Sequence, residues 1–323
     1  MEAGSASELP AGANWRYEPK WDGFRCLAFR DGDKILLKAK SGKPLGRFFP
    51  EVEARLLALP ARRFVLDGEL LIASGGGFSF EALQLRLHPA ASRIRRLAGE
   101  SPAILALFDM LMDDGEDLRP LPLKARREAL EAFHAANGGP ALTLTPGTQD
   151  LAKAQGWLED GLLEGVIAKR LDLPYVPAER VMVKVKRERT ADCVVGGFRY
   201  GANDRLVGSL LLGLFDEAGK LNHVGFTSAI AAADKLALTR RLEGLRGGPG
   251  FTGSAPGGPS RWSTERSAEW EPLRPELVVE VAFDHVSGGR FRHGTRLVRF
   301  RPDKAPRQCT CEQLQSKAKL DLR

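Results

Sequence analysis

The pattern of expected strands and helices changes near residue 188. This change constrains the fold of the chain more than any other feature of its sequence. Before that point, apolar runs of strand length alternate with helix-like stretches, and Pro, Gly and Asp punctuate the joins. The expected strands are residues 61–73, 103–112, 161–170 and 179–188, and the expected helices are 49–59, 123–136 and 150–160. This half is predicted to combine strands and helices around a substantial sheet.

After that point, short strands follow one another at close spacing, with a single helical segment at 230–245. This pattern is typical of a small closed β-barrel of the OB type. The chain has 323 residues, enough for about two domains. We therefore predict an α+β protein with one domain at 1–188 and a second, barrel domain at 189–323.

Composition excludes several classes of protein. The chain is 43% hydrophobic and 28% charged, which is a globular composition. No apolar run is long enough to span a membrane, and residues 1–15 lack the basic and apolar regions of a secretion signal. The four cysteines form no CxxC pair and no zinc pattern. We expect a cytoplasmic protein with reduced cysteines and no membrane partner.

The charge of the chain indicates an anionic partner. The formal net charge is +7. Residues 285–308 carry many basic side chains and a single acid, Asp303; the basic ones are Arg290, Arg292, Arg296, Arg299, Arg301, Lys304 and Arg307. A solvated basic face is one interpretation, but the one-sided local charge favours a surface that binds phosphates.

The segment YEPKWDGFR, residues 17–25, places Lys20 close to Glu18, Asp22 and Arg25. A free lysine has a pKa near 10.4, so it attacks an electrophile only where burial and nearby cations favour the neutral amine. The planar guanidinium of Arg25 suits phosphate oxygens. The segment can be read as a charged turn before a strand, or as a lysine nucleophile with its supporting groups.

Five further segments support the second interpretation. In chain order the six segments are KWDGFR (20–25), LDGEL (66–70), ALFDM (106–110), EGVIAK (164–169), VKVK (183–186) and RFRPDK (299–304). They resemble, in order, the six motifs of the covalent nucleotidyltransferases, and especially of the ATP-dependent DNA ligases. The stretches RTADCVVGGFRYG and FDHVSGGRFRHGTRLVRFRPDK are most similar to small bacterial C-type ligases and to the ligase domain of D-type ligases.

This resemblance implies a fold and a nucleotide site. The fold would be an adenylyltransferase domain of ATP-grasp-like antiparallel sheets with helices, followed by an OB barrel. Lys20 would attack the α-phosphate of ATP and carry AMP. Glu18 would accept a hydrogen bond from the adenine amino group, and Glu69 would accept from the ribose hydroxyls. Phe108 would stack on the base, and Arg25 would hold the ribose or the phosphate of AMP.

The resemblance also implies residues that bind phosphate and metal. Lys184 and Lys186 lie two apart on a predicted strand, so they share one face and would contact the same phosphate. Relatives carry an arginine where Lys40 stands, and a lysine keeps the charge but loses the bidentate geometry. Glu164, together with Glu69, would hold Mg²⁺ or Mn²⁺, because hard cations prefer carboxylate oxygen.

Two parts of this assignment depend on the tertiary structure. Lys169 is five residues from Glu164, so it would face the opposite side of a regular strand unless the strand ends or bulges there. Arg301 and Lys304 would orient the departing pyrophosphate, which requires the OB domain to close over the first domain through a hinge near 187–190. Arg290 and Arg292 would meet the DNA backbone.

The function implied is an ATP-dependent DNA ligase that seals 5′-phosphate/3′-hydroxyl breaks in nicked or gapped duplex DNA, with a role in repair. We expect a monomer, and the resemblance to C-type ligases implies a separately encoded primase-polymerase as a partner. The alternatives are an RNA ligase, an mRNA-capping guanylyltransferase, an NAD-dependent ligase and a non-catalytic OB protein that binds nucleic acid. The histidines His88, His134 and His223 are expected to be surface or loop residues without a role.

Overall fold

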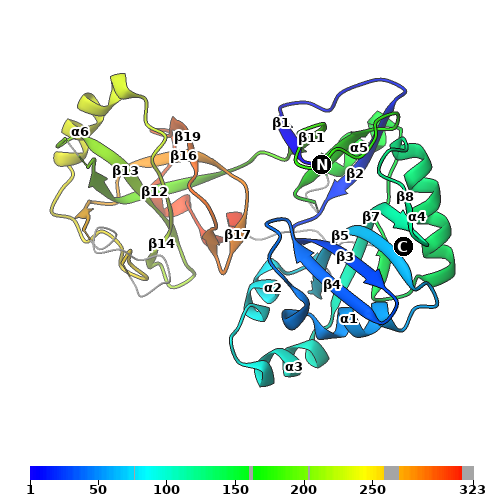
Figure 1. Ribbon diagram of the computed structural model, residues 1–323. Helices are drawn as coiled ribbons and strands as arrows, with labels where there is room; N and C mark the ends of the chain where they lie inside the picture. The colour runs from blue at the N-terminus through cyan, green and yellow to red at the C-terminus, as the bar shows by residue number, and fades with distance from the viewer. Residues whose placement is uncertain (76, 160–162, 203, 258–268, 315–323) are drawn as a thin grey trace. The chain divides into compact units, whose positions relative to one another are not determined.

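A computed structural model describes residues 1–75, 77–159, 163–202, 204–257 and 269–314. The chain divides into two compact units, the first comprising Met1–Arg187 and the second Glu188–Lys317 (Figure 1). The end of the expected barrel domain, residues 315–323, lies outside the described residues.

The first unit contains a seven-stranded sheet with the order β4-β3-β5-β7-β8, in which β6 also pairs with β5 and β9 with β7. Its strands are β3 (Phe24–Asp31), β4 (Lys34–Ala39), β5 (Arg63–Ser74), β6 (Gly77–Phe78), β7 (Ala103–Asp113), β8 (Glu116–Asp117) and β9 (Leu142–Leu144). All pairs are antiparallel except β7 with β9. The two central strands, β5 and β7, are those expected at 61–73 and 103–112.

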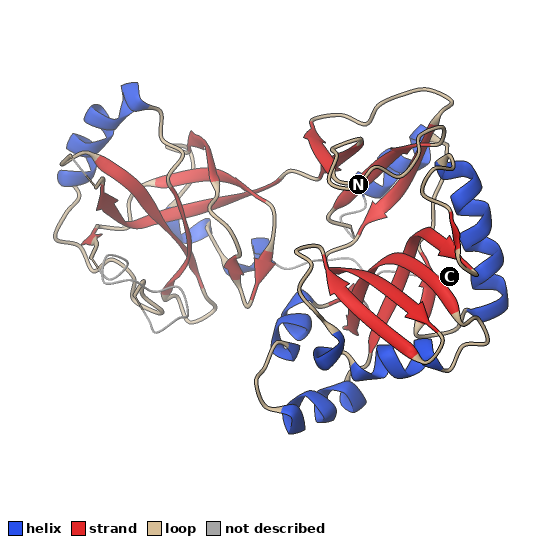
Figure 2. Ribbon diagram, viewed as in Figure 1, coloured by secondary structure: helices blue, strands red, loops and turns tan. Residues whose placement is uncertain are grey.

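Helices cover the larger sheet and bury its apolar side chains. They are α1 (Pro50–Leu57), α2 (Phe80–Arg86), α3 (Ala91–Glu100) and α4 (Leu123–Asn137), with the short 3₁₀ helix η1 (Gly46–Phe48) before α1. Figure 2 shows these helices along the outside of the sheet. Leu66 and Leu70 of β5, Leu105 of β7 and Leu130 of α4 are all fully buried in one core. The burial of this apolar surface stabilises the unit.

A second, four-stranded sheet of the first unit has the order β1-β11-β10-β2. Its strands are β1 (Ala3–Ala6), β2 (Trp15–Lys20), β10 (Gly165–Arg170) and β11 (Met182–Lys186), and helix α5 (Leu151–Glu159) packs against β10 and β2. A Cβ atom on Gly165 would lie 2.2 Å from the carbonyl oxygen of Val185, so a glycine lets β10 approach β11 closely. Both later strands are shorter than the expected 161–170 and 179–188, and residues 160–162 lie outside the described chain.

The second unit is built on a six-stranded antiparallel sheet with the order β14-β13-β12-β16-β19, in which β15 also pairs with β12. The strands are β12 (Arg189–Tyr200), β13 (Val207–Phe215), β14 (Leu221–Thr227), β15 (Glu271–Pro272), β16 (Val278–Phe283) and β19 (Arg296–Phe300). The Oγ1 of Thr227, at the end of β14, donates to the carbonyl oxygen of Thr295, just before β19, at 2.8 Å. The sheet therefore curls until its two edges meet, which gives the expected OB-like barrel.

Smaller elements complete the second unit. They are the hairpin β17 (Val286–Ser287) and β18 (Arg290–Phe291), helix α6 (Lys235–Glu243), and the 3₁₀ helices η2 (Ala232–Asp234), η3 (Pro306–Gln308) and η4 (Cys311–Leu314). The expectation for His223 is wrong: this residue lies on β14 with 6% of its surface exposed, because its ring packs on Phe251 inside the barrel. In the described part of the chain, no helix is long and apolar enough to cross a bilayer.

Candidate active site

A cavity of about 260 Å³ in the first unit receives side chains from both of its sheets. It brings together eight residues that the sequence analysis singled out from distant segments; these are Glu18, Lys20, Arg25, Lys40, Glu69, Phe108, Lys169 and Lys184. We call this cavity the Lys20 pocket. Its walls also include Glu2, Ala3, Pro19, Trp21, Ile167 and Met182. The two sheets therefore meet at a polar cavity with a lysine at its edge.

Lys20 is the last residue of β2, and the strand register places it opposite Gly165, the first residue of β10. Glu164 immediately precedes β10, and its Oε2 accepts a hydrogen bond from the Nζ of Lys20. The Nζ of Lys186 lies 3.1 Å from the other oxygen, Oε1. One carboxylate is thus shared by two ammonium groups that come from strands on either side of β10.

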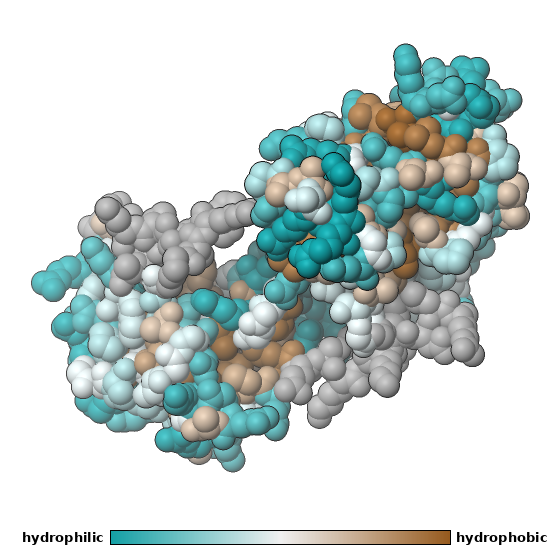
Figure 3. Space-filling view, turned by 90° about the horizontal axis from the view of Figure 1, so that it is seen from below, coloured by the Kyte–Doolittle hydropathy of each residue, from teal (hydrophilic) through white to brown (hydrophobic). Residues whose placement is uncertain are grey.

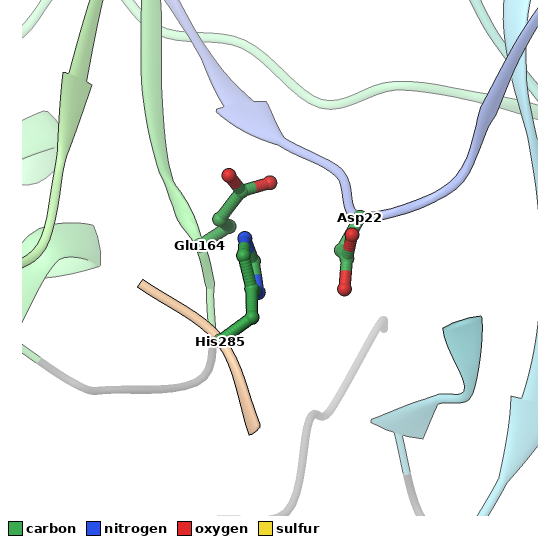
Figure 4. Close-up of side chains that lie close together, drawn as sticks. All are labelled: Asp22, Glu164 and His285. Atoms are coloured by element: carbon green, nitrogen blue, oxygen red, sulfur yellow. The ribbon is translucent and has the colours of Figure 1, made fainter. Parts of the chain in front are cut away.

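Figure 4 shows Glu164 beside the start of β10 and Asp22 on the loop that follows β2. The figure also labels His285, which belongs to the second unit. The side chains of Lys20 and Glu164 are 21% and 6% exposed, so the amine reaches solvent while the carboxylate is buried. A buried carboxylate needs charged or hydrogen-bonding partners, and the two lysines supply them.

Glu18 occupies the same face of β2 as Lys20 and is only 2% exposed. Its carboxylate lies 2.6 Å from the Nζ of Lys169, 3.1 Å from the Nε of Arg16 and 3.8 Å from an Nη of Arg127. The same Lys169 ammonium lies 4.4 Å from the centroid of the Phe108 ring, within the range of a cation–π contact. Three cations therefore balance one buried acid beside an aromatic face.

The position of Lys169 resolves the question of its strand face. Glu164 lies before the first residue of β10, so regular strand alternation does not relate the two side chains. Lys169 contacts Glu18, whereas Glu164 contacts Lys20 and Lys186. Lys169 and Glu164 therefore each contact a residue of β2, but Lys169 contacts Glu18 and Glu164 contacts Lys20.

Arg25 is held by a buried acid that the sequence analysis did not single out. Its Nε and Nη2 donate to the two oxygens of Asp67 at 3.0 and 2.6 Å, and Asp67 is fully buried. The hydroxyl of Tyr175 also donates to Asp67, at 3.0 Å, and the carbonyl oxygen of Met1 accepts from Arg25 at 2.6 Å. Asp67 lies in the apolar run FVLDGELLIA, and a carboxylate buried in such a run needs a specific partner, which is the signal that could have identified it.

Glu69 on β5 pairs in register with Arg25 on β3. Burial raises the pKa of Glu69 to about 8, although the positive charges of Lys20 and Arg25 act in the opposite direction. A Cβ atom on Gly23 would lie 2.7 Å from the Cγ of Glu69 and 2.3 Å from the carbonyl oxygen of Leu70. Glycine at position 23 therefore lets the loop after Lys20 pass directly over β5.

The rim of the pocket is more exposed. Lys40 follows β4, and its Nζ lies 3.1 Å from the carboxylate of Glu2 with 60% of its side chain exposed. The indole nitrogen of Trp21 donates to the Oγ1 of Thr145 at 3.1 Å. Lys184 lines the pocket from β11, and Lys186 lies two residues further along the same strand. Both lysines lie on the regular strand β11, so strand alternation places their side chains on one face.

Arg301 and Lys304 lie in the second unit, after β19. An Nη of Arg301 donates to one oxygen of Asp192 at 2.8 Å, and the Nζ of Lys304 donates to the other at 2.6 Å. Asp303 also accepts from Arg301, at 2.8 and 3.0 Å. Asp192 on β12 was missed in the sequence, because it follows Arg189 and Thr190 at the polar start of the strand, where an acid is unremarkable.

Comparison with known proteins identifies the family. A family model described as the ATP dependent DNA ligase domain matches residues 6–186, and one described as the ATP dependent DNA ligase C terminal region matches residues 203–304. The chain is 44% identical to DNA ligase C2 of Mycolicibacterium smegmatis, over 98% of this chain and 94% of the relative. It is 41% identical to DNA ligase C of Mycobacterium tuberculosis, over 100% of this chain and 95% of the relative.

A solved structure shares the fold. A Lig E DNA ligase superposes with a TM-score of 0.57 at 17% identity, covering 93% of this chain and 100% of that one. The family models together match most of both units, and the relatives match almost the whole chain. The chain belongs to the ATP-dependent DNA ligases.

Proposed function

We propose that this ligase transfers AMP from ATP to the Nζ of Lys20, and then joins a 5′-phosphate to a 3′-hydroxyl in duplex DNA. One observation carries the proposal: Lys20 stands at the edge of a cavity that also holds Glu18, Glu69 and Phe108, and it shares Glu164 with Lys186. An amine, a carboxylate partner, an aromatic platform and further cations are the groups that adenylate formation needs.

Phe108 and Glu18 are suited to an adenine base. An aromatic ring at the pocket wall offers a stacking surface, and stacking does not discriminate between bases. Glu18 can discriminate, because an ionised carboxylate only accepts hydrogen bonds and has capacity for more than the two it accepts from Lys169 and Arg16. The amino group of adenine would donate to it, whereas the carbonyl oxygen of guanine would face it acceptor to acceptor and form no hydrogen bond.

The contact between Lys20 and Glu164 provides a route for the lysine proton. An ammonium cannot attack phosphorus, so a proton must leave the Nζ first, and the Oε2 of Glu164 already accepts a hydrogen bond from it. As the N–P bond forms, the bond from the α-phosphorus to pyrophosphate breaks. Lys184 and Lys186 would counter the negative charge on the α-phosphate during this step.

Glu69 of the Lys20 pocket and Glu164, the partner of Lys20, fit a hard divalent cation such as Mg²⁺ or Mn²⁺. Glu69 and Glu164 would hold it, because carboxylate oxygens are its preferred ligands and a nearby cation would favour the ionised form of Glu69, whose pKa is raised to about 8. When bound, the ion would neutralise phosphate charge and polarise the phosphoryl group.

Two further transfers complete the proposed cycle. An oxygen of the DNA 5′-phosphate attacks the phosphorus of lysyl-AMP and releases Lys20. The neighbouring 3′-hydroxyl then attacks the DNA phosphorus, the phosphodiester forms and AMP departs. The two units would act as separate domains joined near residues 187–190, with Arg301 and Lys304 serving the departing pyrophosphate. Repair of nicks and short gaps is the role we propose, with a primase-polymerase as a candidate partner.

The proposal is tested by incubating the protein with labelled ATP and Mg²⁺ and separating it on a denaturing gel. We expect label on the wild-type chain, its loss on addition of pyrophosphate, and none on Lys20→Ala. Lys34→Ala is the control, because Lys34 is an exposed lysine at the start of β4. Label on Lys20→Ala, or none on the wild type, would contradict the assignment.

A further inference from the structure

Tyr175 lies between β10 and β11 and is 9% exposed. Its hydroxyl contacts both members of the ion pair between Arg25 and Asp67. It donates to the Oδ2 of Asp67 at 3.0 Å and accepts from the Nη2 of Arg25 at 3.2 Å, while that Nη2 also donates to the same Oδ2 at 2.6 Å. Burial raises the pKa of Tyr175, so the hydroxyl keeps the proton that it donates. The three side chains therefore close a ring of hydrogen bonds.

The aromatic ring of Tyr175 meets a second ion pair. The guanidinium carbon of Arg126 lies 5.7 Å from the centroid of the tyrosine ring, within the range of a cation–π contact. The Nε and Nη2 of Arg126 donate to the two oxygens of Asp109 at 2.8 and 2.9 Å. Hydrophilic side chains cover much of the face seen in Figure 3, as is usual for charged groups, whereas Asp67, Asp109 and Arg126 are buried. One tyrosine thus joins two ion pairs inside the first unit.

Both ion pairs lead to the Lys20 pocket. Arg25 lines the pocket, and its guanidinium carbon lies 5.7 Å from the centroid of the Phe108 ring. Asp109 follows Phe108 directly on β7. Tyr175 therefore contacts, through its hydroxyl, the arginine suited to a ribose or a phosphate and, through Arg126, the strand that carries the aromatic wall.

The backbone around Tyr175 is fixed independently of these side chains. The N–H of Tyr175 donates to the carbonyl oxygen of Arg119 at 2.8 Å. The N–H of Leu123, at the start of α4, donates to the carbonyl oxygen of Leu173 at 3.0 Å, and an Nη of Arg126 donates to the same oxygen at 3.2 Å. The tyrosine hydroxyl is therefore a fixed point against which the longer side chain of Arg25 can be oriented.

We propose that Tyr175 is a positioning residue of the nucleotide site, which fixes the plane of the Arg25 guanidinium toward the Lys20 pocket. An arginine side chain has several rotatable bonds, and ordering it when a ligand binds costs free energy. The contact with Tyr175 orders it when the chain folds, so the nucleotide binds to an arginine that is already in place. The inference rests on the proposed function, because it takes the ribose or the phosphate of AMP as the group that Arg25 contacts.

The test removes one hydroxyl group. Tyr175→Phe loses the hydrogen bonds to Asp67 and Arg25 and keeps the ring that contacts Arg126. Tyr17→Phe is the matched control, because Tyr17 is also buried in the first unit, where its hydroxyl donates to the carbonyl oxygen of Pro10 at 2.6 Å. Each protein is first treated with pyrophosphate, to reverse any lysine adenylation.

Two quantities are then measured for each protein. The first is the affinity for labelled AMP by equilibrium dialysis, which does not depend on the transfer step because AMP carries no leaving group. The second is the rate of lysine adenylation over a range of ATP concentrations.

We expect Tyr175→Phe to bind AMP about tenfold more weakly, which is the size of one hydrogen bond to a charged group, and to need about tenfold more ATP for half-maximal adenylation. The rate at saturating ATP should stay within about twofold of the wild type, since Arg25 would contact the nucleotide equally before and during the transfer. Tyr17→Phe should keep the wild-type AMP affinity, although it also loses a buried hydrogen bond.

A double variant tests whether Tyr175 acts through Arg25. Arg25→Lys keeps the positive charge beside Asp67 but loses the planar fork. In the Arg25→Lys background, Tyr175→Phe should weaken AMP binding little further, because the plane that the hydroxyl fixes is gone.

Three results would overturn the inference: wild-type AMP affinity in Tyr175→Phe, an equal loss in Tyr17→Phe, or fully additive losses in the double variant. If the wild type binds AMP but is never adenylated, the proposed function fails, and the AMP affinities of the variants still decide the role of Tyr175.

Discussion

Asp192 and Arg301 form a hydrogen-bonded ion pair of 2.8 Å inside the C-terminal unit, where Asp192 is only 9% exposed. The second oxygen of the same carboxylate accepts from Lys304 at 2.6 Å. One acid on β12 thereby sets the spacing of two cations that follow β19. The side chain of Gln313 fixes the backbone of Asp192 from the other side, with hydrogen bonds of 2.9 and 3.1 Å.

Asp192→Asn should lower the free energy of unfolding by about 1–3 kcal/mol, because two partly buried cations lose the charge of their shared acceptor. Urea unfolding measures the effect. Glu280→Gln is the matched control: Glu280 pairs in register with Asp192, but its partner Arg299 is 62% exposed, so we expect a change below about 1 kcal/mol. If both substitutions lower the free energy of unfolding by the same amount, the Asp192 contacts stabilise the unit no more than an exposed ion pair does.

The same substitution should also separate the reaction steps. If Arg301 and Lys304 act on the departing pyrophosphate, Asp192→Asn should slow lysine adenylation more than it slows sealing of a nick that already carries AMP. A general loss of folding would slow both steps together, so the ratio of the two rates is the informative measurement.

Glu164→Gln should reduce the rate of lysine adenylation by about 100-fold or more, since an amide cannot take the proton that Lys20 must lose. A time course of label incorporation at saturating ATP measures the rate. Asp172→Asn is the control, because Asp172 forms an exposed pair with Arg170 just after β10. An unchanged rate in Glu164→Gln would exclude Glu164 as the proton acceptor.

Lys169→Met should destabilise the first unit by about 3 kcal/mol, because Glu18 is buried and would lose the nearest of its three cations. Lys169→Arg keeps the charge and should restore most of this stability, which thermal unfolding of both variants can measure. ATP affinity should fall with Lys169→Met as well, since the Glu18 carboxylate and the Phe108 ring both contact Lys169. Equal stability of the two variants would show that Arg16 and Arg127 suffice for Glu18.

The stability of the C-terminal unit should depend on pH through His223. Burial, together with the charges of Arg290 and Arg199, lowers the pKa of His223 from 6.5 to about 3. Between these values the unfolded chain binds the extra proton, so the free energy of unfolding should fall by about 1.4 kcal/mol for each pH unit below 6.5 and stay level above it.

Urea unfolding of the wild type and His223→Gln at about pH 5 and about pH 7 tests this. Other titrating groups cancel in the difference between the two proteins, so the variant should lose about 2 kcal/mol less than the wild type on acidification. Parallel pH profiles would show that the ring titrates in the folded state as it does in the unfolded chain.

Local patterns in the sequence were sufficient to predict the central strands of the first unit and to identify residues whose chemistry stands out. Apolar runs of strand length predicted the central strands β5 and β7, whereas β2, which ends at Lys20, was not predicted. The lysines two apart on β11 could be placed on one face because strand alternation follows from neighbouring residues alone, whereas Glu69 and Glu164 were identified through the resemblance to the ligase motifs.

Tertiary structure alone decided which charges are partners. Asp67 accepts from Arg25, Lys169 contacts both Glu18 and Phe108, and Asp192 accepts from both Arg301 and Lys304. In each of these contacts the two partners lie far apart in the sequence. His223 is buried for the same reason, since the curl of the barrel encloses its strand. Sequence periodicity determines which face of an element is apolar, whereas strand register and sheet curvature determine which side chains meet across elements, because those depend on contacts between segments many residues apart.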